Sequence, residues 1–108
     1  MKMTKEELQQ YLERASLPVA RGEFKKIQAP PFITYDYAYS SDMYADNHNY
    51  CSIANYDIEL FRAEGDDLSE QLLEELFRNT DLPYEKQGSW LREDRIRQTV
   101  YTIKIVEG

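Results

Sequence analysis

The sequence predicts an α+β domain, in which a mainly antiparallel four-stranded sheet carries two amphipathic helices on one face. Two observations lead to this fold. Two segments repeat apolar residues at helical spacing, and each begins with a capping pattern. Four other segments alternate apolar and polar residues and form two pairs, which is typical of hairpins that need no crossover helix. The predicted order is therefore helix, strand, strand, helix, strand, strand.

The first helix is predicted from about residue 4 to residue 15. Thr4 and Glu7 have the spacing of a capping box, and Pro18 ends the element. One apolar stripe follows at helical spacing: Leu8, Tyr11, Leu12 and Ala15.

The first hairpin is predicted after a connecting stretch that contains Val19 and Phe24. The apolar positions of its two strands recur with period two: Ile33, Tyr35, Tyr37 and Tyr39, then Tyr56, Ile58 and Leu60. We interpret the three strand tyrosines mainly as core residues on the covered face of the sheet. Turn-forming residues dominate the segment between the strands, from Ser40 to Asn49, which predicts a long loop. Loops of this length are often functional.

The second helix is predicted from about residue 67 to residue 79, with Asp67 and Glu70 as its capping signal. Its apolar stripe contains Leu68, Leu72, Leu73, Leu76 and Phe77, and Glu70, Glu74 and Glu75 are expected on the outer, solvent side. A second hairpin is predicted from residues 84–90 and 96–106, around the turn Arg92-Glu93-Asp94. The core side of its last strand is Tyr101, Ile103 and Ile105.

Length and charge limit the classes of function. The chain has 108 residues without an internal repeat or a linker, which predicts a single domain over residues 1–108. Its 20 acidic residues against 13 basic ones give a net charge of −7, which opposes tight binding to nucleic acid or to an anionic membrane. The sequence contains no apolar run that would span a membrane and no secretory signal. A single cysteine excludes an internal disulfide and favours a reducing cytoplasm.

The sequence carries no catalytic signature. His48 is the only histidine, which excludes sites built from two or more, and we interpret it as a solvated loop residue. Cys51 has no neighbouring base or cationic patch to activate it. Asp42 and Asp46 lack the glycine and the oxygen ligands of a calcium loop, and none of the four glycines has phosphate-loop spacing. We therefore expect no enzyme activity, no cofactor and no metal.

Protein contact is the expected use of the remaining polar and aromatic residues. Tyrosine supplies a large contact area with a polar tip, and complementary charges set the register of an interface. The candidate contact residues lie in the long loop, on the acidic helix face and in the basic turn: Asp42, Tyr44, Asp46, His48, Tyr50, Glu70, Glu74, Arg92 and Arg95. The helix face and the turn, which also includes Arg97, form a candidate charge-complementary pair between subunits.

A series of short phrases carries a resemblance to a known family. In order they are LPVARGEF, QAPPFITYDY, the loop phrase ADN, ANYDIELF, DLSEQLLEELF, LPYEKQGSW and RQTVYTIKI. Together they resemble the small tail-completion proteins of long-tailed phages and prophages, also called tail terminators or tail-to-head joining proteins. The resemblance extends from about residue 3 to residue 106, and APPFITY and YDIELF are its clearest phrases.

The resemblance implies a structural virion protein. Such proteins are small α+β domains that assemble as a hexameric ring on the last ring of tail-tube protein, stop its growth and present a surface to the head connector. The implied partners are other copies of the chain, the tail-tube protein and the connector or stopper protein. The implied location is the tail–head junction of a virion assembled in the bacterial cytoplasm. An acidic ring would also let double-stranded DNA pass without specific binding, because a negative lumen repels phosphate.

Two alternatives stay open at this stage. The first is an acidic inhibitor that mimics DNA, which would require carboxylates aligned in a surface row. The second is a small metal-binding domain or enzyme that uses Asp42, Asp46 and His48.

Overall fold

The computed structural model describes residues 3–41, 43–45 and 48–106, with 43–45 and 48–51 described by their backbone only. The elements in chain order are α1 (Lys5–Glu13), β1 (Val19–Arg21), β2 (Phe32–Ser40), β3 (Met43–Ala45), β4 (His48–Cys51), β5 (Ile53–Ala63), α2 (Leu68–Asn79), β6 (Tyr84–Leu91) and β7 (Ile96–Val106). The predicted α+β class and both predicted helices are confirmed.

The main sheet has five strands in the order β1-β2-β5-β7-β6. The β2–β5 and β6–β7 hairpins are antiparallel, as predicted, and β5 and β7 join them in the centre. The predicted count of four strands is wrong because β1 pairs in parallel with β2, where Val19 lies opposite Ile33. This strand has only three residues, which is too short to show an alternating pattern in the sequence.

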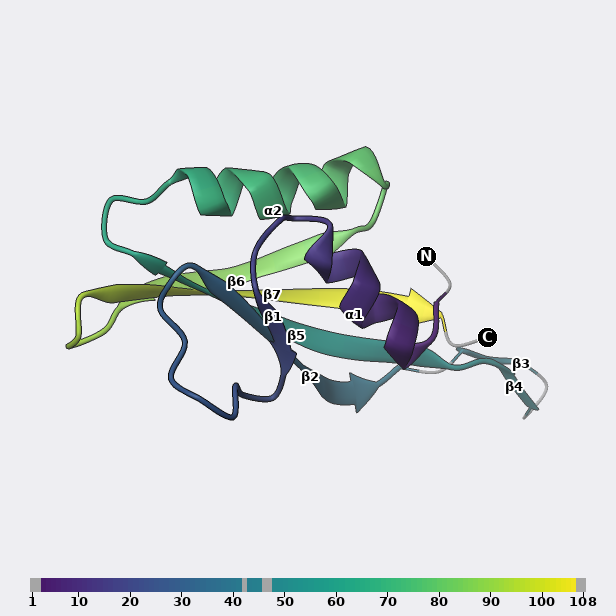
Figure 1. Cartoon of the computed structure of the whole chain (residues 1–108). Helices are drawn as coiled ribbons and strands as arrows, with labels where there is room; N and C mark the ends of the chain where they lie inside the picture. Colours follow the sequence, from purple (N-terminus) through teal and green to yellow (C-terminus); the bar gives the residue numbers. More distant parts are fainter. Residues whose placement is uncertain (1–2, 42, 46–47, 107–108) are drawn as a thin grey trace.

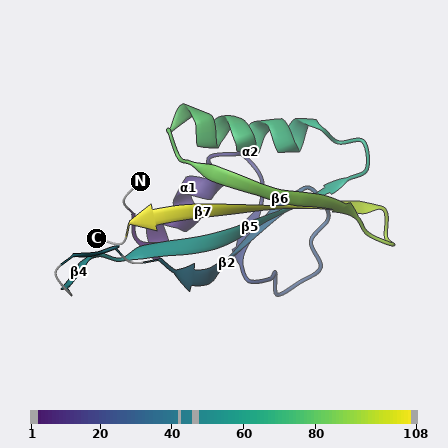
Figure 2. The ribbon, with the colours of Figure 1, turned by 180° about the vertical axis from the view of Figure 1, so that it is seen from behind.

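Both helices pack on one face of this sheet (Figure 1), and the opposite face is open in the view from behind (Figure 2). The core lies between the helices and the covered face. Its largest members include Leu8, Leu12, Ile33, Ile58, Leu60, Leu73, Phe77, Tyr101, Ile103 and Ile105. The predicted apolar sides of β5 and β7 are therefore confirmed.

The start of α1 follows the sequence closely. The Thr4 hydroxyl accepts a hydrogen bond from the Glu7 amide at 3.2 Å, and the Glu7 carboxylate accepts one from the Thr4 amide at 3.3 Å. This reciprocal pair is the predicted capping box. The helix ends at Glu13, two residues earlier than predicted, and Ser16 then adopts a left-handed φ of 64°.

The start of α2 is capped by a different residue from the one predicted. Asp67 makes no capping hydrogen bond with its side chain. Instead, the Asp66 carboxylate accepts from the Ser69 amide at 3.2 Å and from the Ser69 hydroxyl at 2.6 Å. The Ser69 hydrogen bonds, which outweigh partial burial, hold the pKa of Asp66 below its ordinary value. Two consecutive aspartates precede the helix, so the sequence pattern alone did not identify the capping residue.

We expect Asp66→Ala to lower the free energy of unfolding by about 1 kcal/mol, since it removes the cap. The neighbouring Asp67→Ala removes a carboxylate that is 79% exposed, and we expect a change below about 0.5 kcal/mol. Urea unfolding of both variants, followed by circular dichroism, measures the difference. Equal losses for the two variants would contradict this assignment of the cap.

The prediction that three strand tyrosines are core residues on one covered face holds for Tyr35, whereas Tyr37 keeps that face but is not a core residue and Tyr39 leaves it. Tyr35 is 5% exposed, but Tyr37 and Tyr39 are 48% and 53% exposed. A register shift between Tyr37 and Tyr39 places Tyr37 opposite Tyr56 and Tyr39 opposite Asn55, which is a β-bulge. Because a one-residue slip reverses the face of a strand, Tyr39 lies on the side opposite Tyr37.

The predicted long loop between the first two hairpin strands contains structure of its own. β3 and β4 pair antiparallel in a separate two-stranded sheet, which we call the ribbon (residues 43–45 and 48–51). It projects from the end of the main sheet (Figure 1), and the molecule measures 50 × 27 × 23 Å. The abundance of turn residues suggested a loop, but an antiparallel pair this short needs little alternation.

The free edge of β6 is also irregular. Its pairing with β7 shifts register between Lys86 and Gly88, which is a second bulge. The Lys86 side chain turns toward the helix face, where its ammonium group meets carboxylates of α2.

Candidate functional site

The predicted contact residues of the loop lie in or beside the ribbon. Tyr44 belongs to β3, and His48 and Tyr50 belong to β4. In the register of the ribbon, Tyr44 lies opposite Asn49, and Ala45 opposite His48. Asp42 and Asp46 lie outside the described residues. The ribbon thus brings the predicted aromatic positions onto one projecting element.

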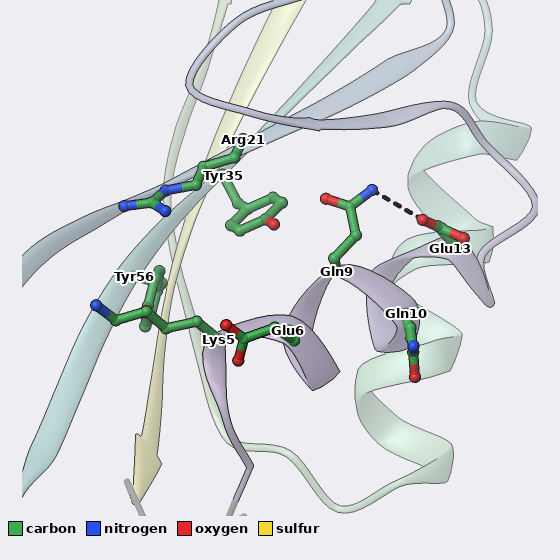
Figure 3. A pocket seen from close by; sticks show the side chains of 8 residues that line it. All are labelled: Lys5, Glu6, Gln9, Gln10, Glu13, Arg21, Tyr35 and Tyr56. Atoms are coloured by element: carbon green, nitrogen blue, oxygen red, sulfur yellow. Dashed lines mark hydrogen bonds between the residues drawn. The ribbon is translucent and has the colours of Figure 1, made fainter.

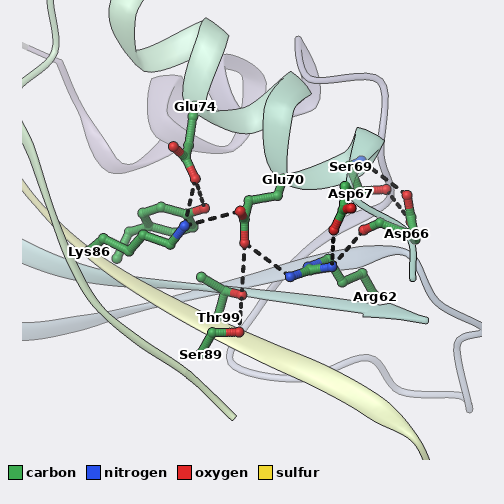
Figure 4. A network of polar contacts seen from close by, with 10 residues as sticks. Arg62, Asp66, Asp67, Ser69, Glu70, Glu74, Lys86, Ser89 and Thr99 are labelled. Carbon is green, nitrogen blue, oxygen red and sulfur yellow. Dashed lines mark hydrogen bonds and ion pairs between the residues drawn. The ribbon is translucent and has the colours of Figure 1, made fainter. Parts of the chain in front are cut away.

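A network of charged side chains connects α2 to the sheet (Figure 4). Arg62 on β5 contacts Glu70 at 3.1 Å, and the Lys86 ammonium lies 3.1 Å from Glu70 and 3.1 Å from Glu74. The Tyr101 hydroxyl donates to Glu74 at 2.7 Å. Arg62 is only 6% exposed, so the network contains a buried cation.

This network corrects the prediction that the carboxylates of α2 face solvent. The side chains of Glu70 and Glu74 are only 23% and 18% exposed and point to the sheet, whereas Glu75 is exposed. Leu73 and Phe77 share this buried side of the helix. Glu70 and Glu74 therefore bind within their own subunit, which leaves them poor candidates for contacts between subunits.

The predicted basic turn is exposed but locally paired. The Arg92 guanidinium lies 3.5 Å from Asp94, and Arg95 lies 3.0 Å from Glu64. Arg92 also lies over the Phe61 ring, 5.4 Å from its centroid. The predicted pairing between this turn and α2 of a neighbouring subunit is therefore unsupported, because the carboxylates Glu70 and Glu74 bind within their own subunit. Arg92 also lines an apolar groove.

The network shifts the pKa values of its members. Burial alone would raise the pKa of Glu74, but hydrogen bonds from Tyr101 and Lys86 outweigh it and hold that pKa below its ordinary value. Burial would lower the pKa of Lys86, and the carboxylates of Glu70 and Glu74 instead raise it. Burial and the Glu74 carboxylate both raise the pKa of Tyr101. Together the three shifts favour a charged Glu74–Lys86 pair and a neutral Tyr101 that donates a hydrogen bond to it.

The lowered pKa of Glu74 predicts a pH-dependent contribution to stability. A depressed folded-state pKa stabilises the fold above the unfolded-state pKa of about 4.3, and the gain is lost as the pH falls through the folded-state value. We expect Glu74→Gln to cost about 2 kcal/mol at pH 7 and much less at pH 3. Urea midpoints of both proteins at the two pH values provide the measurement. If the wild-type protein and Glu74→Gln lost the same stability between pH 7 and pH 3, the result would contradict this role of Glu74.

A polar cleft of about 460 Å³ lies between α1 and the β1–β2 edge (Figure 3). Tyr35 and Tyr56 form its inner wall, and Lys5 and Arg21 lie at one side. At the other side, Gln9 donates to Glu13 at 2.8 Å and to the Val19 carbonyl at 3.0 Å. The cleft offers cations, carboxylates and aromatic rings but no Ser, Cys or His among its lining residues, so it is a surface for polar contact.

An apolar groove of about 330 Å³ lies on the open face of the sheet, opposite the helices. Phe32 stacks on Phe61 with 4.8 Å between ring centroids, and Phe24 meets Phe32 edge-on at 5.4 Å. Ile27 lines the same groove and is fully exposed. We call this hollow the aromatic groove.

Sequence reasoning missed the aromatic groove. Phe61 directly follows the buried Leu60 on β5, so it occupies one of the alternate positions of that strand that point away from the core. Phe32 lies opposite Phe61 on β2 and points to the same open face. The signal for such an apolar patch is an aromatic residue in both strands of a hairpin at positions where the alternating pattern predicts polar residues on the open face.

Comparison with known proteins gives no match, either to a protein-family model or to a curated protein. Within residues 3–41, 43–45 and 48–106, no three Asp, Glu, His or Cys side chains are grouped to hold a metal ion. Neither α1 nor α2 has the length and apolar character that crossing a membrane requires. The surfaces that stand out on the described part of the chain are therefore the ribbon, the polar cleft and the aromatic groove.

Proposed function

We propose that this chain is a structural subunit that completes a phage tail. It would form a ring, hexameric as in the family it resembles, that caps the tail tube and joins it to the head connector. The observation that carries the proposal is a projecting ribbon at one end of a sheet whose other face is open. A ring needs two different surfaces that fit each other, and this subunit offers two.

The charge of the chain supports the same proposal. A net charge of −7 per subunit makes a ring of several copies strongly acidic. DNA that leaves the head would then be repelled by the ring and would slide through it. The partners in this proposal are further copies of the chain, the tail-tube protein and the connector or stopper protein, all at the tail–head junction of the virion.

Deletion of the gene in its source phage or prophage tests this function. We expect electron microscopy of the induced particles to show filled heads beside unattached tails, with tubes of irregular excess length. A wild-type copy supplied in trans should restore joined virions, which is the control for effects on neighbouring genes. Normal joined virions after deletion would overturn the proposal.

One feature of the open face favours a second candidate, an acidic protein that mimics DNA. Asp36 on β2 lies directly opposite Asp57 on β5, and Glu85 on β6 continues the row beyond Thr102. Like charges directly opposite each other destabilise a sheet, so this row carries a cost in stability. Reversal of the row by Asp36→Lys and Glu85→Lys would abolish inhibition of a DNA-binding protein. The same double variant should leave tail completion unchanged, which separates the two candidates.

A further inference from the structure

Asn55 is a polar residue in an unusual place. Its neighbours on β5, Ala54 and Tyr56, belong to the core, so the alternation of the strand places Asn55 on the opposite, open face. It lies opposite Lys104 on β7 and is nevertheless fully buried. Asparagine is mostly found at the surface, because a buried amide group must find hydrogen-bond partners. The partners of Asn55 explain its burial.

The Asn55 amide binds the end of β2, where the chain leaves the main sheet for the ribbon. Its nitrogen donates to the Tyr39 carbonyl at 3.1 Å and to the Ser41 hydroxyl at 2.9 Å. A carbonyl only accepts hydrogen bonds, so the contact with Tyr39 fixes which side of the amide faces β2. One amide group thus holds two alternate residues at the exit of β2.

The base of the ribbon has a second anchor close to this one. The Ser41 amide donates to the Ile53 carbonyl at 2.9 Å, which joins the chain that enters the ribbon to the chain that leaves it. The Ser40 hydroxyl donates to the same carbonyl at 3.4 Å. Bonds to a single carbonyl leave the chain free to turn about that point. Asn55 follows Ile53 on β5 and holds Ser41 from a different point, so it opposes such a turn.

The ribbon depends on these anchors for its direction. Among the residues that the structure describes, its backbone pairs within itself and not with the main sheet, and it projects from the end of that sheet (Figure 1). A two-stranded sheet this short is marginally stable alone, because it has no core. Its links to the main sheet are short, residues 41–42 on one side and residue 52 on the other. The hydrogen bonds at its base are therefore in a position to set its angle to the main sheet.

The Asn55 contact also carries a cost in stability. The side-chain oxygen of Asn55 is buried and has no hydrogen-bond partner within the described part of the chain. An unsatisfied buried acceptor destabilises a fold, so stability alone would favour an apolar residue at this position. Buried asparagines in coiled coils show the same exchange, since they lower stability and specify one register. The burial of Asn55 is thus typical of a residue that specifies one arrangement.

We infer that Asn55 is a positioning residue, which holds the β3–β4 ribbon at one angle to the main sheet in the free subunit. The inference goes beyond the proposed function and does not depend on it. A ribbon held in this way is preformed, so a partner protein binds it without first having to order its direction. Asn55 therefore strengthens any contact made by the ribbon, although its own buried side chain touches no partner.

Pulsed electron paramagnetic resonance between two spin labels tests this inference. The background chain carries Cys51→Ser, which replaces the only cysteine, with labels attached at Ala45→Cys in β3 and Asn79→Cys on the exposed end of α2. We expect one narrow distance distribution in this background. Asn55→Ala should widen the distribution about twofold or more, because the ribbon then turns about its remaining anchor. An equal width in the two proteins, or a broad distribution in the background, would overturn the inference.

Two further variants separate positioning from a general loss of stability. Ser41→Ala removes one of the two Asn55 contacts and keeps the backbone anchor, so the width should be intermediate. Thr34→Val is the matched control, since the buried Thr34 hydroxyl donates to Glu59 at 3.2 Å on the same face, further from the ribbon. It should leave the width unchanged, and thermal melts show whether each variant is folded.

The controls also fix the results that would contradict the role of Asn55. A widening in Thr34→Val as large as that in Asn55→Ala would show a general loosening of the sheet and would remove the positioning role. If Asn55→Ala does not fold, Ser41→Ala decides the question, and an unchanged width in that variant would overturn the inference.

Discussion

Arg62→Ala should lower the free energy of unfolding by about 3 kcal/mol, because it removes one partner from a buried charge network. The guanidinium donates to the Asp66 carbonyl at 2.7 Å and contacts Glu70 at 3.1 Å, while the residue is 6% exposed. Its loss leaves the Asp66 carbonyl without this donor and leaves Glu70 with less compensation for its partial burial. Urea unfolding followed by circular dichroism measures the change.

Arg78→Ala is the matched control for Arg62, since it removes the same kind of side chain at an exposed position. Arg78 lies 3.9 Å from Glu74 and its side chain is 56% exposed, so we expect a change below about 1 kcal/mol. If both variants lost the same stability, burial of Arg62 would not be the reason for its effect.

Phe77→Ala should lower the free energy of unfolding by about 4 kcal/mol, the largest effect we expect from a single substitution. Phe77 is fully buried, with Tyr84 and Tyr101 rings at centroid distances of 5.0 and 5.6 Å. Truncation removes apolar burial and leaves a cavity between α2 and the sheet. A domain of this size has a total stability of roughly 5–15 kcal/mol, so the variant should be close to unfolding at moderate temperature.

The urea midpoint and its slope measure the Phe77 effect. We expect the midpoint to fall while the slope stays constant, which is the behaviour of a protein that loses stability without losing its two-state transition. Leu68→Ala, at an exposed position on the same helix, should change stability by less than about 0.5 kcal/mol. A small effect at Phe77 would mean that α2 packs on the sheet differently.

The parts of the fold that the sequence predicted are those with a regular period. Leu8 and Leu12 recur at helical spacing, and Tyr56, Ile58 and Leu60 alternate, because each set faces one core. The three residues of β1 are too few to show a period. The bulge between Tyr37 and Tyr39 interrupts the period of β2, but the sequence still alternates apolar and polar residues there and gives no sign of it. Local irregularity of this kind depends on pairing with another strand, which no segment carries alone.

The candidate site was less predictable because it depends on which side of an element faces a neighbour. Glu70 and Glu74 were expected in solvent, since carboxylates usually lie there. Their burial depends on Arg62, Lys86 and Tyr101, which come from three different strands. The segment from Ser40 to Asn49 is predicted from the sequence as a functional loop, its two short strands escape that prediction, and its contact role remains a prediction.

The irregular edge of β6 has a consequence for how copies of this protein can aggregate. A regular free edge would accept a strand from another molecule, and repeated pairing of this kind builds fibrils. The bulge between Lys86 and Gly88 breaks the regular row of backbone groups with which such a strand would pair. The β6 edge is therefore a poor template for repeated strand addition. A high local concentration of the protein during assembly need not lead to amyloid through this edge.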